Sequence, residues 1–357
     1  MKAFRFEQWQ KTATLKDVPK PEPGPGEVLI RIGGAGACHS DLHIMHEWTP
    51  ETFPQVADWP LPFTLGHENA GWIESGDHDG FDVGAPVVIS PTWSCGHCPP
   101  CRKGWTNYCD TVDLGAGGLG VDGGLAEYMV APATTLVPLR NLEPAEAAPL
   151  TDAGLTSYHA VKRCLPILEP GTTVVVIGVG GLGHLGVAFL RELSGAQIIA
   201  VDRDPGALQM ASGLGAHVCL PSDDTTVEQV KALTGGQGAD VIYDAVGGDA
   251  FDQAMGCINW NGRLLVVGFA SGRIPEVAVH RVMNKGCEIV GVLWGATLLR
   301  EPDVNRKNFE EMLEWFSQGK LKPYVSSVLP MHRAAEALGL LLARKSVGKV
   351  VLSMRDT

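Results

Sequence analysis

The chain contains 357 residues, of which 45% are hydrophobic and 19% are charged, and its formal net charge is −12. Because single hydrophobic cores stop growing beyond roughly 250–300 residues, we expect two globular domains. The negative charge argues against a nucleic-acid partner, since contact with phosphate backbones requires basic side chains. The sequence shows no apolar leader and no apolar run near the roughly 20 residues of a spanning helix. We therefore expect a cytoplasmic protein without membrane contact.

The first 150 residues are rich in glycine, proline and short β-branched runs, which favours a β-rich domain. Strands are predicted at residues 28–32 and 86–89. Residues 19–26, PKPEPGPG, are expected to be extended or turned, because proline has no amide hydrogen and restricts the residue before it.

The pattern changes near residue 154, where short apolar runs begin to alternate with amphipathic segments. Strands are predicted at 173–177, 198–201, 241–243 and 264–267, and helices at 182–193, 207–214 and 249–258. Such alternation is typical of a parallel sheet with right-handed crossovers. After residue 294 the alternation stops, and two helices (309–316 and 333–344) and a strand (347–353) are expected to return to the first domain.

A glycine-rich turn joins the first predicted strand of this alternating region to its helix. Gly178, Gly180 and Gly183 follow the pattern G-x-G-x-x-G, which binds the diphosphate of a dinucleotide on a helix N-terminus. Asp202, at the end of the next strand, predicts hydrogen bonds to the adenosine ribose and a preference for NAD over NADP. The adjacent Arg203 could instead accommodate a 2′-phosphate, and the plainer alternative is a glycine-rich corner that binds nothing.

Four cysteines lie within fifteen residues, at Cys95, Cys98, Cys101 and Cys109. Four thiolates form a closed tetrahedral site, which indicates structural zinc. An iron–sulfur cluster matches the number of ligands, but not the usual ferredoxin spacings. A zinc-ribbon module for nucleic acid is opposed by the acidic charge.

Further metal-binding residue types occur in three separate fragments. The run CHSDLH spans residues 38–43, GHE spans 66–68, and Asp152 follows at a distance. Cysteine, histidine and aspartate are all good zinc ligands, and a catalytic zinc has three protein ligands and one open position.

In this order the motifs resemble those of the zinc-dependent, medium-chain alcohol dehydrogenase family, from residues 25–28 to 348–351. The resemblance implies an α/β fold, in which a doubly wound Rossmann sheet is joined to a β-rich GroES-like catalytic domain. The NAD-binding Rossmann domain would span residues 154–294, and the catalytic domain residues 1–153 and 295–357 with both zinc sites. An aspartate as third zinc ligand resembles a bacterial secondary-alcohol-type subgroup.

The resemblance implies that Cys38, His67 and Asp152 bind the catalytic zinc, so that each subunit holds two Zn²⁺ ions with the cysteine site. A carboxylate is a harder ligand than a thiolate, so this zinc should be more electrophilic and more exchangeable. Asp41 would orient His67 through the other ring nitrogen. Glu68 would be either a transient fourth ligand or a neighbour of the ligands.

The chemistry implied is hydride transfer from a zinc-bound alcohol to NAD⁺. Ser40 would take the hydroxyl proton and pass it through the nicotinamide ribose toward His43 and solvent. The plainer alternatives are that His43 is a surface histidine and that Ser40 bonds only within its own loop.

The resemblance also places residues beside the cofactor and the substrate. The further cofactor neighbours are Gly181, Leu182, Val246, Val267, Gly268, Leu293 and Trp294. Trp48, Trp93 and Trp294 are candidates for the wall of the substrate pocket, although aromatic residues are as often part of a core.

The function that these residues favour is an NAD-dependent zinc alcohol dehydrogenase, which interconverts a primary or secondary alcohol and its aldehyde or ketone. A related polyol or amino-alcohol dehydrogenase ranks second, and a non-enzymatic zinc-binding module third. The expected partners are a small-molecule substrate and further copies of the chain, in a homodimer or homotetramer.

Overall fold

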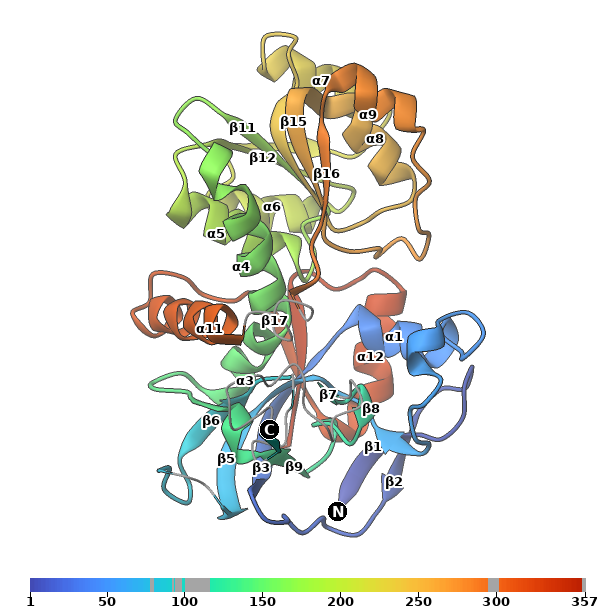
Figure 1. Ribbon diagram of the computed structural model, residues 1–357, viewed down its shortest axis with the longest axis vertical. Helices are drawn as coiled ribbons and strands as arrows, with labels where there is room; N and C mark the ends of the chain where they lie inside the picture. The colour runs from blue at the N-terminus through green and yellow to red at the C-terminus, as the bar shows by residue number, and fades with distance from the viewer. Residues whose placement is uncertain (78–79, 92, 94–97, 100–115, 295–301, 355–357) are drawn as a thin grey trace. The chain divides into compact units, whose positions relative to one another are not determined.

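The computed structural model describes residues 1–77, 80–91, 93, 98–99, 116–294 and 302–354. The chain divides into two compact units (Figure 1). Unit 1 comprises Met1–Asp152 and Gly295–Thr357, and unit 2 comprises Ala153–Trp294. No helix in the described ranges combines the length and the apolarity that a membrane crossing needs.

Unit 1 is built mainly from strands. Its largest sheet has the order β10-β6-β5-β3-β18-β17, with β9 also pairing with β3. Smaller sheets are formed by β2-β1-β4 and by β7-β8. The strands are β1 (Lys2–Phe6), β2 (Thr14–Asp17), β3 (Glu27–Ala37), β4 (Phe63–Thr64), β5 (Glu68–Gly76), β6 (Pro86–Ile89), β7 (Ala116–Gly117), β8 (Gly120–Val121), β9 (Tyr128–Pro132), β10 (Leu136–Pro138), β17 (Val325–Pro330) and β18 (Lys349–Ser353).

In its described ranges, unit 1 also contains helices of 4 to 16 residues. They are α1 (His39–His46), α3 (Pro144–Ala147), α11 (Pro302–Ser317) and α12 (Ala334–Leu342), with the 3₁₀ turns η1 (Pro54–Val56), η3 (Ala133–Thr135), η4 (Ala148–Thr151) and η6 (Met331–Arg333). Leu42 and Ile44 of α1 and Leu338 of α12 join the core that Ile30 and Ile32 of β3 form. The residues after position 301 therefore pack with the first part of the chain.

The central strand β3 brings distant parts of the sequence together at its C-terminal end. Gly36 pairs with Glu68 at the start of β5, and Ala37 pairs with Val350 near the start of β18. A Cβ atom on Gly36 would lie 1.9 Å from Oε2 and 2.9 Å from Cβ of Glu68, so a larger residue here would displace the Glu68 side chain. The segments around residues 38, 68 and 349 consequently lie side by side at the C-terminal end of β3.

Unit 2 contains a parallel sheet with the strand order β13-β12-β11-β14-β15-β16. Helices α4, α5 and α6 pack together on one face, and α7, α8 and α9 lie on the other (Figure 1). The strands are β11 (Thr173–Ile177), β12 (Gln197–Asp202), β13 (Val218–Pro221), β14 (Ala239–Asp244), β15 (Ile258–Val266) and β16 (Glu288–Gly291). The helices are α4 (Ala153–Cys164), η5 (Leu165–Ile167), α5 (Gly183–Leu193), α6 (Pro205–Gly213), α7 (Thr226–Leu233), α8 (Asp249–Cys257) and α9 (Val279–Lys285).

The parallel sheet confirms the prediction made from alternating strands and helices. Strand β11 has the sequence TVVVI and is buried along its whole length, as a central strand covered on both faces should be. The strand order reverses between β11 and β14. Ligands of open α/β sheets bind outside the carboxyl ends of the strands at such a reversal.

Candidate metal centre and dinucleotide site

Three side chains of unit 1 form a group that could hold a metal ion. The ligand atoms of Cys38, His67 and Asp152 all lie within 4.8 Å of one another. Nε2 of His67 is 3.4 Å from Oδ2 of Asp152, and Sγ of Cys38 is 3.8 Å from the same oxygen. Cys38 caps α1 directly after β3, His67 precedes β5, and Asp152 follows η4, so three different elements supply the group.

The spacing fits zinc. Tetrahedral coordination at the usual bond lengths separates nitrogen from oxygen by about 3.4 Å and sulfur from oxygen by about 3.6 Å. Neither ring nitrogen of the buried His67 has a hydrogen-bond partner among the described residues. Burial lowers the pKa of His67, but the negative charges of Asp41 and Cys38 outweigh it and hold the pKa well above its ordinary value. The group therefore favours a positive charge at its centre, and metal binding would release a proton.

Asp41 connects two of these residues. One carboxylate oxygen accepts the backbone N–H of Cys38 at 3.0 Å, which caps the first turn of α1. The other lies 3.4 Å from Nδ1 of His67. The fully buried Asp41 carboxylate is therefore placed where it can fix the orientation of the imidazole.

Glu68 is held by a lysine that the sequence analysis did not predict. The Lys349 ammonium lies 2.7 Å from Oε2 of Glu68 and donates hydrogen bonds to Oε1 at 2.9 Å and to the Ala37 carbonyl at 3.0 Å. The side chains are 4% and 0% exposed, respectively. Burial raises the pKa of Glu68 to about 7, and the Lys349 charge opposes that rise. In this arrangement the Glu68 carboxylate is an ion-pair partner of Lys349 and is not among the three grouped ligands.

Helix α1 carries the two residues of the expected proton path. Oγ of Ser40 lies 3.8 Å from Sγ of Cys38. His43 is one turn further along the same helix, and its Nδ1 lies 2.7 Å from Oε2 of Glu47. Trp48 stacks on the His43 ring, with 5.8 Å between ring centroids and 19° between planes. Trp48, expected in a substrate wall, is thus part of the surroundings of His43.

The glycine-rich turn in unit 2 has the shape that a diphosphate requires. Gly178 has φ +81°, a value that favours glycine. A Cβ atom on Gly183 would lie 1.9 Å from the Gly178 carbonyl oxygen, so this glycine permits close packing. Gly180 faces open space, with no atom within 4 Å of a Cβ built there. Among the described residues no side chain caps the N-terminus of α5, which follows Gly181 and Leu182, so no capping side chain would compete with an anion there.

Asp202 lies beside this turn. Its Oδ2 accepts the N–H of Val179 at 2.6 Å, and its Oδ1 accepts the N–H of Asp204 at 2.9 Å. The carboxylate therefore ties the end of β12 to the glycine-rich turn. Arg203 is exposed and forms no ion pair with Asp202 in the described structure.

The remaining predicted cofactor neighbours lie on the loops that follow β14 and β15. Asp244, which was not predicted, connects these loops. Its side chain accepts the N–H groups of Val246 at 2.8 Å and Gly247 at 3.0 Å, and its carbonyl accepts that of Val267 at 2.8 Å. Gly268 follows directly. These loops meet the glycine-rich turn, since a Cβ atom on Gly178 would lie 2.3 Å from Cγ2 of Val246.

For the remaining predicted residues the structure gives only their burial or a single contact. Leu293 is exposed and Trp294 is buried. The indole of Trp93 donates a hydrogen bond to the Ser90 carbonyl at 3.2 Å. Of the cysteine quartet, Cys98 is buried, whereas Cys95, Cys101 and Cys109 lie outside the described residues.

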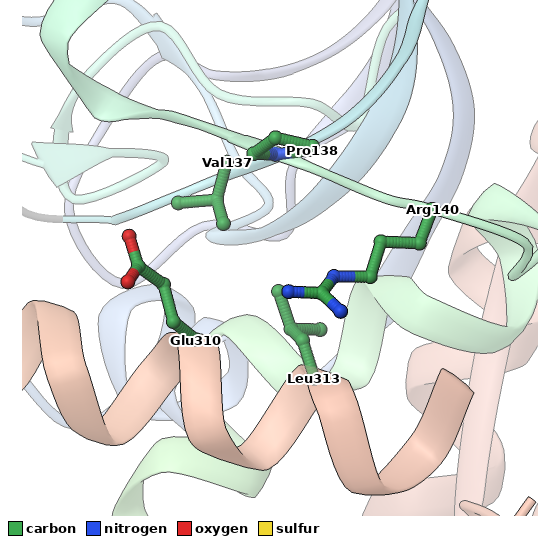
Figure 2. A pocket seen from close by; sticks show the side chains of 5 residues that line it. All are labelled: Val137, Pro138, Arg140, Glu310 and Leu313. Atoms are coloured by element: carbon green, nitrogen blue, oxygen red, sulfur yellow. The ribbon is translucent and has the colours of Figure 1, made fainter. Parts of the chain in front are cut away.

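A small hollow of about 270 Å³ lies elsewhere in unit 1, between the end of β10 and α11 (Figure 2). It is lined by Val137, Pro138, Arg140, Glu310 and Leu313. Arg140 forms an ion pair with Glu314, and Glu310 accepts a hydrogen bond from Arg306. Because its charged groups are engaged by neighbours on the surface, this hollow gives no reason to place a substrate there.

Comparison with known proteins identifies the family. Residues 24–141 match the model of the alcohol dehydrogenase GroES-like domain, and residues 181–318 match that of the zinc-binding dehydrogenase domain. An NAD-dependent alcohol dehydrogenase of Sulfolobus acidocaldarius is 33% identical, covering 99% of this chain and 100% of the relative. An alcohol dehydrogenase of Geobacillus stearothermophilus is 35% identical with the same coverage. The crystal structure of the Aeropyrum pernix alcohol dehydrogenase superposes with a TM-score of 0.87 at 33% identity, over 99% of this chain and 100% of that one.

The chain belongs to the zinc-dependent alcohol dehydrogenase family. The predicted fold, a Rossmann-type parallel sheet with a GroES-like domain, is thereby confirmed. Three residues that contact the predicted site residues were not predicted from the sequence, namely Glu47, Asp244 and Lys349. Glu47 had a usable signal, since it follows His43 by four residues and such residues are neighbours on a helix. Lys349 had none, because 281 positions separate it from Glu68.

Proposed function

We propose that Cys38, His67 and Asp152 bind the catalytic zinc of this NAD-dependent alcohol dehydrogenase, which interconverts primary or secondary alcohols and their aldehydes or ketones. The observation that carries the proposal is the mutual approach of these three ligand atoms to within 4.8 Å. Asp41 orients His67, and the Lys349–Glu68 pair supports the strand ends that present Cys38.

The chemistry is divided between the bound groups and the chain. When bound, zinc polarises the substrate oxygen and NAD⁺ accepts the hydride. Ser40, beside Cys38, accepts the hydroxyl proton as it releases its own proton toward His43. His43, one turn further along α1, passes that proton toward solvent. Both proton carriers thus stand on one short helix whose first turn is fixed by the Asp41 capping interaction.

In unit 2 the glycine-rich turn binds the diphosphate of NAD, with Gly180 at the point of closest approach. Asp202 bonds the adenosine ribose, which favours NAD over NADP because a 2′-phosphate would be repelled. Val246, Val267 and Gly268 lie on the loops that Asp244 joins, and they form one wall of the cofactor site.

We also propose a second metal site, an assembly and a cellular location for this protein. Cys95, Cys98, Cys101 and Cys109 bind a second, structural zinc, so that each subunit holds two ions. The protein assembles as a homodimer or a homotetramer. It acts in the cytoplasm.

The test is a substrate panel. Purified protein is mixed with NAD⁺ and primary, secondary, benzylic and polyol alcohols, and the absorbance of the reduced cofactor is followed. We expect turnover with primary or secondary alcohols and much weaker turnover with NADP⁺. A protein that contains zinc and binds NADH but oxidises none of these alcohols would contradict the proposal.

A further inference from the structure

The turn at the C-terminal end of α1 is hydrogen-bonded to the backbone of His43. The backbone N–H groups of Glu47 and Trp48 both donate to the His43 carbonyl, at 2.9 and 2.8 Å. Because Glu47 follows His43 by four residues, its side chain lies on the same face of the helix. The end of the helix therefore presents a carboxylate and an indole to one imidazole.

The contact between the two side chains determines which nitrogen of His43 carries hydrogen. Nδ1 lies 2.7 Å from Oε2 of Glu47. An ionised carboxylate only accepts hydrogen bonds, so Nδ1 must be the donor. In a neutral imidazole, Nε2 then carries the lone pair. Nε2 has no hydrogen-bond partner in the part of the chain that the structure describes.

The ring is also held by stacking. Trp48 stacks on His43, and Phe53 also stacks on Trp48, with 4.5 Å between the Trp48 and Phe53 centroids and 20° between their planes. A 180° turn of the imidazole about its Cβ–Cγ bond would place the carbon Cδ2 beside Glu47 instead of Nδ1, and the hydrogen bond to Oε2 would be lost. The orientation of the ring and the position of its proton are therefore fixed together.

We propose that Glu47 is a positioning residue for the proton path: it holds His43 in the tautomer whose Nε2 is a free base. This inference rests on the proposed role of His43, which must accept a proton before passing it to solvent. A proton acceptor needs a lone pair at the nitrogen that meets the donor. Glu47 supplies that condition through its contact with Nδ1.

The alternative is an ordinary helix-surface ion pair. The Glu47 side chain is 46% exposed and that of His43 is 18% exposed. Because exposed pairs of this spacing contribute little to stability, the two readings differ in what the loss of Glu47 changes. A surface pair would affect stability slightly and the rate not at all. A positioning residue would affect the rate and the tautomer.

The experiment uses the full-length, zinc-loaded protein and two variants of similar side-chain length. Glu47→Met removes the acceptor, whereas Glu47→Gln removes the charge but keeps an oxygen for Nδ1–H. We expect kcat for alcohol oxidation to fall about 10-fold in Glu47→Met with the KM for NAD⁺ unchanged, and Glu47→Gln to recover most of it. Glu310→Met is the matched control, because it removes the Arg306–Glu310 pair, which has the same spacing on α11.

The tautomer is read directly, without substrate, from ¹⁵N-labelled histidine by NMR at alkaline pH. The His43 signal is assigned by its absence in His43→Asn. We expect the Nδ1–H form in the wild-type protein and a mixture with Nε2–H in Glu47→Met. An Nε2–H form in the wild-type protein, or a Glu47→Met variant with unchanged spectrum and kcat, would overturn the inference. Failure of the wild-type protein to oxidise any alcohol would count against the proposed function instead, and the spectrum would still decide whether Glu47 sets the tautomer.

Discussion

Removing the ammonium group of Lys349 should destabilise the protein in a manner that depends on pH. The substitution Lys349→Met keeps the length of the side chain but leaves the fully buried Glu68 carboxyl without its cation. A buried charge that loses its partner is strongly unfavourable, so Glu68 should become neutral instead.

The magnitude follows from the pKa of Glu68. Burial raises this pKa to about 7 with Lys349 present, compared with about 4.3 for an unperturbed carboxyl. Without Lys349 the pKa should rise further, and the carboxyl should stay protonated up to pH 9. For each pH unit above 7, the free energy of unfolding of the variant then falls by about 1.4 kcal/mol relative to that of wild type. At pH 9 the difference is about 2.7 kcal/mol. At pH 6 the carboxyl is largely protonated in both proteins, and this part of the difference vanishes.

A group whose pKa is higher in the folded state contributes stability at low pH, and this contribution is lost as pH rises through the folded value. The free energy of unfolding of Lys349→Met should therefore drop increasingly below that of wild type between pH 7 and pH 9.

The assay is urea unfolding followed by tryptophan fluorescence at pH 6 and pH 9, at fixed protein and zinc concentrations. Lys2→Met is the control, since it breaks only the exposed Lys2–Asp17 pair and should cost under about 1 kcal/mol at either pH. The double variant Lys349→Met/Glu68→Met should recover most of the loss, because a buried pair is often replaceable by apolar side chains. An equal effect of Lys349→Met at both pH values would refute the reasoning.

Three other changes separate the remaining roles. Cys101→Ser should lower zinc content by about one ion per subunit and cause loss of the folded state in thermal scans, because structural zinc contributes folding free energy; unchanged zinc content and melting would contradict the cysteine site. Asp202→Ser should shift the ratio of kcat/KM for NAD⁺ and NADP⁺ toward NADP⁺ by about 10-fold or more, as 1–2 kcal/mol of discrimination would give, and an unchanged ratio would count against the ribose contact. Gly180→Ala should weaken NADH binding by about 10-fold with no change in thermal stability, since the position faces open space; a variant that binds NADH as wild type does would remove Gly180 from the diphosphate site.

The parts of the fold that could be predicted are those in which one strong local pattern decides. The run TVVVI of β11 and the glycine-rich turn after it are such cases. Strand β3 was predicted only over residues 28–32 but reaches Ala37, because three glycines near its end give no hydrophobic signal. The edge strands β13 and β16 were missed since they are short and only half-buried, so their sequences lack the continuous apolar run of a central strand.

The residues of the site also differ in how well a local sequence pattern predicts them. Cys38 and His67 stand in short motifs that can be recognised without a structure. Lys349 meets Glu68 only because β18 and β5 flank the same central strand, and no spacing in the sequence records that neighbourhood. Buried charge pairs between distant strands are therefore the feature of this site that sequence patterns predict least well.

We propose above all that three residues from separate elements hold the metal that activates the alcohol. The most direct measurement is zinc content per subunit, determined together with alcohol turnover and NADH affinity, in wild type and in Asp152→Ala. We predict that the variant loses about one zinc ion and nearly all turnover while it binds NADH as wild type does, because Asp152 belongs to the metal site and not to the glycine-rich turn. An Asp152→Ala protein with full zinc content and full turnover would contradict the account.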